Sequence, residues 1–168
     1  VLEDILDHYQ EFLPTQPPRS QVPPGANEGD PHLSRYQVNL IVDRRGKTGA
    51  PVIYENHPTF QNLIGKMEYV LQFGVATTGF EKIQAGAMHM ANGGYLLLDA
   101  LEVLRSPFAW EAIKNSLKSG MIKIEDMGEQ YRMFAAGSLK PEPVPLNIKV
   151  ILIGTPLIYY QLLAYEED

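Results

Sequence analysis

A pair of glycines followed by an apolar run and one acid constrains the fold of this chain more than any other segment. Residues 93–99 read Gly-Gly-Tyr-Leu-Leu-Leu-Asp, so the run ends at the carboxylate of Asp99. Continuous apolar residues are typical of a buried parallel strand, which carries charge only where it reaches the surface. Ligands of an open α/β sheet bind at its carboxyl edge, where an aspartate can hold Mg²⁺ directly or through water. The pattern predicts a core strand with a candidate metal ligand at its end; the alternative is that Asp99 only caps the next helix.

Composition narrows the class of protein. The chain has 168 residues, 45% of them apolar, which is enough to bury one core of ordinary domain size. The net charge of −6 argues against a general nucleic-acid binder, and the one basic cluster, residues 44–47, is too short for an electrostatic footprint. The lack of cysteine excludes disulfides and thiolate metal sites and fits a reducing compartment. No apolar run approaches the ~20 residues of a membrane span and no signal peptide is visible, so we expect no membrane partner and a cytoplasmic location.

The two ends of the chain differ in pattern. Residues 1–13 carry apolar side chains on one helical stripe that Pro14 ends, which predicts an amphipathic helix that packs against the body or, alternatively, against a partner. Residues 14–35 are rich in Pro, Gly, Asn, Gln and Ser without an apolar period, which is typical of a linker or mobile loop. The chain stops inside an apolar helical pattern over residues 159–165, so we expect it to be a fragment.

Three further segments have the pattern of strands. Residues 36–43 alternate and then become continuously apolar, which predicts a strand with one well-buried end. Residues 51–55 predict a short strand. Residues 148–153 predict a second buried strand that closes on Gly-Thr-Pro, where Thr155 is placed to cap the following helix.

Two helices are predicted between the first strands and residue 120. Thr59 opens a helix or helical turn that runs to Gly65. Ser106 is a natural N-cap with Pro107 at the first helical position, and the apolar stripe that follows ends at Gly120.

A β-hairpin is predicted between the second helix and the last strand. Residues 121–125 and 131–135 have the pattern of short strands around the polar residues 126–129, and an ordinary surface hairpin would show the same pattern. Residues 141–145, Pro-Glu-Pro-Val-Pro, then predict a stiff extended connector.

Gly46-Lys47-Thr48 is similar to the end of a phosphate-binding P-loop, but its surroundings do not fit one. A P-loop requires glycine five positions before Gly46, where this chain has Ile41, and a helix directly afterwards, where it has Gly-Ala-Pro. We interpret the segment as a polar turn between strands. The lone His57 is more typical of a loop residue than of a catalytic base, because no His/Cys metal-binding pattern accompanies it.

Several spaced blocks, in the same order, resemble the AAA+ ATPase core of the Lon-related ATP-dependent proteases. The blocks are PVIYENHPTFQNLIGKMEY, TTGFEKIQAGAMHMANGGYLLLDAL and SPFAWEAIKNSLKSGMIKIED, flanked by RYQVNLIVD and GSLKPEPVPLNIKVILIG. The resemblance implies that residues 36–168 are a partial AAA+ core of the α/β class, a P-loop NTPase three-layer sandwich with a mostly parallel sheet and an inserted β-hairpin. It also implies that the P-loop, the helical lid and the peptidase domain lie outside this chain.

The resemblance assigns roles to four residues. Asp99 takes the place of the Walker B aspartate, which binds the Mg²⁺ of ATP. Thr155 takes the place of sensor 1, which reads the γ-phosphate through the attacking water, although AAA+ families often have Asn there. Residues 73–86 correspond to the insertion that points into the central pore, with Phe73 or Phe80 as the aromatic that grips a translocating polypeptide; an ordinary buried aromatic is the alternative. The predicted hairpin corresponds to the pre-sensor insertion.

One position departs from the family pattern. AAA+ ATPases usually follow the magnesium aspartate with a glutamate that polarises the hydrolytic water, and this chain has Ala100 there. A methyl group cannot accept a proton or orient water. Glu102 is therefore the candidate replacement, and the alternative is that it is a solvated charge before a helix.

The function that the resemblance implies belongs to a larger protein. That protein would bind ATP and Mg²⁺, assemble as a homo-oligomeric ring, expected to be a hexamer, and thread protein substrates to a Ser-Lys dyad in a downstream domain. The chain alone is expected to be inactive. Two alternatives stay open, namely a non-proteolytic AAA+ remodeller of the transcription-activator or chelatase branch, and a degenerate noncatalytic scaffold domain.

Overall fold

The computed structural model describes residues 37–72, 75–124 and 139–165. The chain divides into two units, residues 1–39 and residues 40–168, and all of the elements below belong to the second. The predicted helix over residues 1–13, the linker over 14–35 and the second hairpin strand over 131–135 lie outside the described residues.

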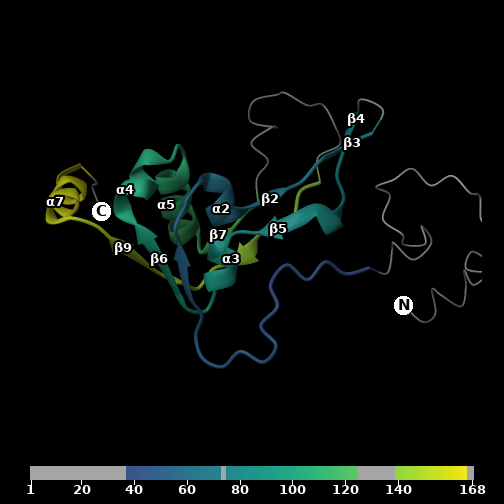
Figure 1. Ribbon diagram of the computed structural model, residues 1–168, viewed down its shortest axis with the longest axis horizontal. Coiled ribbons are helices and arrows are strands. Elements are labelled where there is room, and N and C mark those ends of the chain that lie inside the picture. The colour runs from purple at the N-terminus through teal and green to yellow at the C-terminus, as the bar shows by residue number, and fades with distance from the viewer. Residues whose placement is uncertain (1–36, 73–74, 125–138, 166–168) are drawn as a thin grey trace, which may run out of the picture. The chain divides into compact units, whose positions relative to one another are not determined.

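Three parallel strands form the central sheet. They are β1 (Val52–Glu55), β6 (Tyr95–Asp99) and β9 (Lys149–Ile153), in the order β1-β6-β9 (Figure 1). The glycine-led apolar run, which was predicted to be a core strand, is therefore the middle strand of this sheet. All three of these strands were predicted, and the α/β fold with a parallel sheet is confirmed.

Helices from the described residues cover one face of this sheet. The α-helices among the described residues of the unit are α2 (Phe60–Ile64), α3 (Ala87–Ala91), α4 (Ala100–Arg105), α5 (Ala109–Ser119) and, after β9, α7 (Pro156–Tyr165). Successive strand residues point to opposite faces, and Leu96 and Leu98 are completely buried on the helical side of β6. They share one hydrophobic core with Leu63 of α2, Met88 of α3 and Ile113 of α5. By contrast, α7 has no buried residue.

Two of the predicted helix ends are confirmed. Thr59 caps α2, because its Oγ1 accepts a hydrogen bond from the N–H of Asn62 at 3.2 Å. Gly120 ends α5 with a left-handed φ of 66°, a conformation that glycine adopts without a steric penalty.

No helix in the described part of the chain is both long enough and apolar enough to cross a membrane.

Short antiparallel ribbons connect α2 to α3 and close the end of α5. The elements are β2 (Gly65–Met67) with β5 (Ile83–Ala85), β3 (Val70–Gln72) with β4 (Val75–Thr77), and β7 (Met121–Ile122) with β8 (Val144–Pro145). Figure 1 shows the first two ribbons following each other as one arm that leads away from the three-stranded sheet. The sequence predicts an insertion in this region but not its strands, because segments of two or three residues show no apolar period.

The predicted start of the second helix is wrong. Residues 100–105 form the separate helix α4, and Ser106 ends it, since its N–H bonds the carbonyl oxygens of Glu102 and Val103. α5 begins only at Ala109, after Phe108 with a left-handed φ of 63°. The physical reason is that Asp99 already caps a helix, and that Pro107 lacks the N–H needed to continue it.

The strand predicted over residues 36–43 is also not formed. Residues 37–43 have no regular structure, and Val38 is 87% exposed. A strand needs a neighbour for its backbone groups, and an apolar pattern cannot supply one. The turn predicted at Gly46 is confirmed, because Gly46 has a φ of 74° and the N–H of Lys47 bonds the carbonyl oxygen of Arg44.

Two predictions near the carboxyl end need correction. β9 was predicted to be buried, but Ile151 and Ile153 are 44% and 49% exposed because they point away from the helical face. Residues 141–145 were predicted to be a connector, but Val144 and Pro145 pair with β7. A proline is compatible with such a two-residue edge strand.

Candidate functional site

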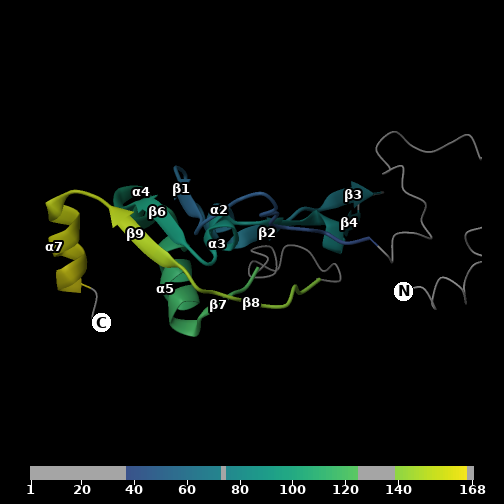
Figure 2. The same ribbon diagram turned by 90° about the horizontal axis from the view of Figure 1, so that it is seen from below.

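The carboxyl ends of the parallel strands lie at one edge of the sheet. β1 ends at Glu55, β6 at Asp99 and β9 at Ile153, and Asp99 lies directly opposite Ile153 in the ladder. Thr155 follows two residues later. Figure 2 shows β6 and β9 side by side with both arrows ending at this edge. The structure therefore brings Asp99 and the segment of Thr155 to neighbouring strand ends.

The glycine pair fixes the opposite end of the middle strand. Gly93 has a left-handed φ of 84°. A Cβ at Gly94 would collide with the carbonyl oxygen of Pro51, which accepts the N–H of Tyr95 at 2.8 Å. Glycine is required at both positions because the chain turns into β6 directly against the segment that leads into β1.

Two side chains that the sequence did not indicate, those of Arg44 and Asn92, link the segments that precede the three parallel strands. Arg44 donates from Nη2 to the carbonyl oxygens of Met90 at 2.8 Å and Asn92 at 2.7 Å. The Asn92 side chain donates to the carbonyl oxygen of Pro145 at 2.8 Å and accepts the N–H of Asn147 at 2.8 Å. The segments before β1, β6 and β9 are thus linked to one another. A polar residue directly before a glycine pair is the one signal that could have indicated this role.

The carboxylate of Asp99 caps helix α4. Its Oδ1 accepts a hydrogen bond from the backbone N–H of Glu102 at 3.0 Å, and the residue is half-buried. Within the described part of the chain, no hydrogen bond engages Oδ2. The capping role that the sequence left open as an alternative is therefore observed, and it orients the carboxylate while leaving one oxygen available to a cation.

The position after Asp99 is closely packed, whereas Glu102 is not. Ala100 is buried, and a Cβ at Gly154 would lie 3.0 Å from the Cβ of Ala100. Glu102 lies in the first turn of α4, with Oε1 3.5 Å from Nη1 of Arg105. An exposed pair of this kind is worth at most about 1 kcal/mol, so it does not fix the Glu102 side chain in place.

Thr155 is exposed and directly precedes α7. Its carbonyl oxygen accepts the N–H of Tyr159 at 3.3 Å, which is the first hydrogen bond of the helix. The residue therefore lies at the predicted cap position, with its side chain at the surface beside the end of β9.

Of the two aromatic residues predicted to grip a translocating polypeptide, only Phe80 lies within the described residues. Phe80 begins the short 3₁₀ helix η3 (Phe80–Lys82), between β4 and β5 of the arm, and is 38% exposed. Phe73 lies outside the described residues.

His89 of α3 is a buried titratable group that sequence reasoning also missed. Neither of its ring nitrogens has a hydrogen-bond partner among the described residues. Burial lowers the pKa of His89 below its ordinary value of 6.5. It belongs to the covered side of the sheet, because α3 packs against β1 and β6.

The carboxyl edge offers one candidate ligand for a magnesium ion. Among the described residues there is no cluster of three or more His, Cys, Asp or Glu side chains that could hold a metal ion. Mg²⁺ is usually held by one or two carboxylates together with phosphate oxygens and waters. Asp99, with Oδ2 available, has the chemistry of such a single protein ligand.

The parallel strands, the helical layer and the acid that ends the middle strand define an α/β domain of the P-loop NTPase type. The family model of the LonB-like AAA domain matches residues 48–168, and the chain belongs to this family. A protein of Escherichia coli (strain K12) named "Putative Lon protease homolog" is 32% identical over 77 residues. The match covers 43% of this chain and 12% of that protein, so the chain corresponds to a small part of the relative's length.

Proposed function

We propose that this chain is part of the ATPase module of a Lon-like ATP-dependent serine protease, which couples ATP binding and hydrolysis to the unfolding and degradation of protein substrates. Membership of the LonB-like AAA family supports this proposal. The observation that carries it is the position of Asp99 at the end of the middle strand, opposite the end of β9. The Ser-Lys dyad would lie outside this chain.

Each residue of the edge has a chemical task in this proposal. Asp99 is the residue that would hold Mg²⁺, with Oδ1 kept in place by its bond to Glu102 and Oδ2 directed to the ion. Bound Mg-ATP supplies the phosphoanhydride whose hydrolysis drives the motor. The Thr155 hydroxyl can hydrogen-bond phosphate or water at the neighbouring strand end. The Glu102 carboxylate, once it leaves Arg105, can accept a proton from water, which Ala100 cannot do.

The arm and the assembly complete the proposal. Phe80, and Phe73 with it, would grip the translocating polypeptide. A homo-oligomeric ring, expected to be a hexamer, would bring several arms around one substrate protein. The isolated 168-residue chain is expected to show neither ATP hydrolysis nor peptide cleavage.

Nucleotide binding by the full-length protein tests the role of Asp99. A fluorescent ATP analogue should bind in a Mg²⁺-dependent manner, and Asp99→Asn should weaken that binding by about tenfold or more, the scale on which lost support of a metal ion lowers its affinity. Asparagine still caps a helix, so α4 is retained. Asp43→Asn is the matched control, because Asp43 is an exposed carboxylate that bonds Arg45. Equal Mg²⁺-dependent binding by Asp99→Asn would contradict the proposal.

A noncatalytic scaffold is the second candidate, and Ala100 favours it. For a motor, Glu102→Gln should lower kcat of ATP hydrolysis by roughly 100-fold, the usual contribution of a general base, and leave nucleotide binding unchanged. A scaffold would show no turnover to lose. ATP hydrolysis without degradation of a denatured substrate protein would instead indicate a non-proteolytic remodeller.

A further inference from the structure

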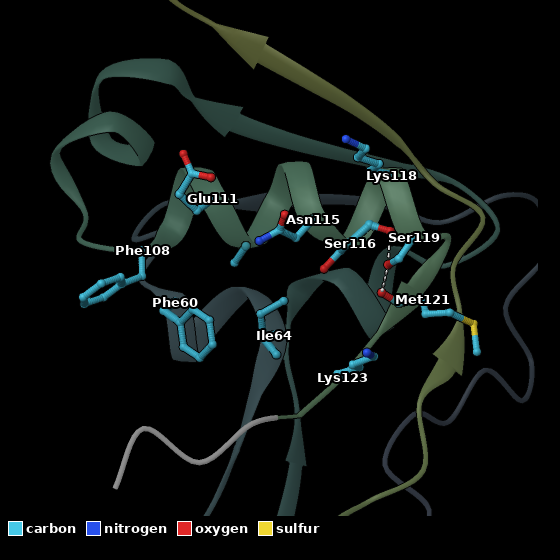
Figure 3. A pocket seen from close by; sticks show the side chains of 11 residues that line it. Phe60, Ile64, Phe108, Glu111, Asn115, Ser116, Lys118, Ser119, Met121 and Lys123 are labelled. Atoms are coloured by element: carbon cyan, nitrogen blue, oxygen red, sulfur yellow. Dashed lines mark hydrogen bonds between the residues drawn. The ribbon is translucent and has the colours of Figure 1, made fainter. Parts of the chain in front are cut away.

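A groove lies on the helical side of the unit, between α2, α5 and β7 (Figure 3). Its volume is about 580 Å³, which is enough for a few side chains of a bound peptide. None of Asp99, Glu102 and Thr155 lines it. The groove is therefore a separate feature from the carboxyl edge of the sheet.

Apolar side chains form one wall of the groove. Figure 3 shows Phe60 and Ile64 on α2, alongside α5, with Phe108 at one end of the groove. Phe108 is 49% exposed and is the one non-glycine residue with a positive φ in the described part of the chain. A left-handed non-glycine residue costs about 1–3 kcal/mol and persists only where the surrounding structure holds it. Here that strain holds an aromatic ring in solvent beside an apolar wall, which is an arrangement typical of a binding surface.

The charged groups of the groove leave an excess of positive charge. Among the described residues, Glu111 is the one carboxylate in the lining, and it forms an ion pair with Lys114 at 2.8 Å. Lys118 and Lys123 also line the groove, and no carboxylate of the described residues forms an ion pair with either. The whole chain has a net charge of −6. The groove is therefore lined by two lysines that have no ion pair among the described residues, on a chain whose overall charge is negative.

We propose that this groove binds an acidic amphipathic segment of a substrate or partner protein. Apolar side chains of the segment would pack between Phe60, Ile64 and Phe108, and its carboxylates would lie against Lys118 and Lys123. The Asn115 amide, which also lines the groove, offers a donor and an acceptor to a peptide backbone. This binding requires no nucleotide, so it stands or fails independently of the role of Asp99.

A protein segment fits these features better than a nucleic acid does. Single-stranded nucleic acid needs a continuous positive channel in which successive bases stack on aromatic rings. This groove offers two lysines, and Ile64 lies between its two aromatic residues and Lys123 in Figure 3. An apolar wall with a charged end instead matches a helix or strand whose apolar and acidic residues alternate.

Fluorescence anisotropy on the full-length protein tests the proposal. The probe is a fluorescein-labelled twelve-residue peptide that carries Phe, Leu and Glu in an amphipathic pattern. It should bind without nucleotide, and replacing every Glu with Gln or Lys should weaken binding by about tenfold, as expected for the loss of two ion pairs at a partly desolvated site. Raising the salt concentration should weaken binding of the Glu peptide most.

Paired variants separate the groove from the rest of the surface. K118E/K123E should weaken binding of the Glu peptide by about tenfold or more, and K47E, an exposed lysine in the turn before β1, should leave it unchanged. Phe108→Asn removes the ring but tolerates the left-handed backbone, and it should also weaken binding with unchanged circular dichroism. Unchanged peptide binding by K118E/K123E would overturn the proposal. So would tighter binding of an oligonucleotide at these lysines, or self-association of the protein that K118E/K123E abolishes and the peptide does not displace.

Discussion

Both faces of the three-stranded sheet carry apolar side chains, but the surroundings of the two faces differ. On one face, Leu96 and Leu98 are completely buried beneath α2, α3 and α5. On the other, Tyr54 is 53% exposed and Ile153 49% exposed, and no described helix covers them. Alternation along β6 also places Asp99 on the face of Leu97, away from the helical core. Apolar composition therefore marks residues that suit a parallel sheet, and which of them are buried depends on where the helices lie.

The largest change in unfolding free energy is expected from truncating one leucine on each face of the sheet. Leu98→Ala should lower the free energy of unfolding by about 2–5 kcal/mol, because it leaves a cavity in the helical core. Leu97→Ala should cost less than half as much, since Leu97 is only half-buried. Chemical denaturation of both variants measures the difference. Equal losses would show that both faces are buried in solution.

The sequence predicted those features that depend on one short segment. The run from Tyr95 to Asp99 predicted a core strand with an acid at its carboxyl edge, and residues 51–55 and 148–153 predicted the other two strands from their own patterns. Each of these predictions rests on local composition. The open face of the sheet was not predictable, because a buried strand and a half-buried one can share the same apolar run.

The errors arose where distant contacts or a second cap decided the structure. Val38 and Leu40 belong to a segment with the pattern of a strand, but among the described residues no strand pairs with it. Ser106 has the chemistry of an N-cap, yet it ends α4 because Asp99 had already begun that helix. Arg44 and Asn92 act across more than forty residues of sequence, which no local pattern records.

The next test separates the structural role of Asp99 from its proposed chemical role. Asp99→Ala removes the cap of α4 and should cost about 1 kcal/mol of unfolding free energy. Asp99→Asn keeps an oxygen at the cap and should cost only a fraction of that. Thermal or chemical unfolding of the two variants measures this difference. If Asp99→Asn destabilised the fold as much as Asp99→Ala, the negative charge itself would be structural.

A smaller effect is expected from the buried histidine on the covered face. Because burial lowers the pKa of His89 below 6.5, the unfolded chain binds a proton more readily than the folded one between the folded pKa and 6.5. Stability should therefore be unaffected by His89 above pH 6.5 and should fall as the pH drops from 6.5 toward the folded pKa. His89→Leu should remove this part of the pH dependence, measured as the difference between the two unfolding profiles. Identical profiles would mean that His89 finds a partner in solution.

The smallest effect is expected at the end of β9, where neighbouring residues lie on opposite faces. Ile153→Thr should change the unfolding free energy by no more than about 0.5 kcal/mol, as is usual for an exposed position. Leu152→Thr, one residue earlier, places a hydroxyl against the helical core and should cost about 1–3 kcal/mol. Parallel denaturant titrations of the two variants measure the contrast. Strand propensity cannot explain a larger loss at Leu152, because isoleucine favours strands more than leucine does. A similar cost at both positions would mean that another surface buries Ile153 as deeply as the helices bury Leu152.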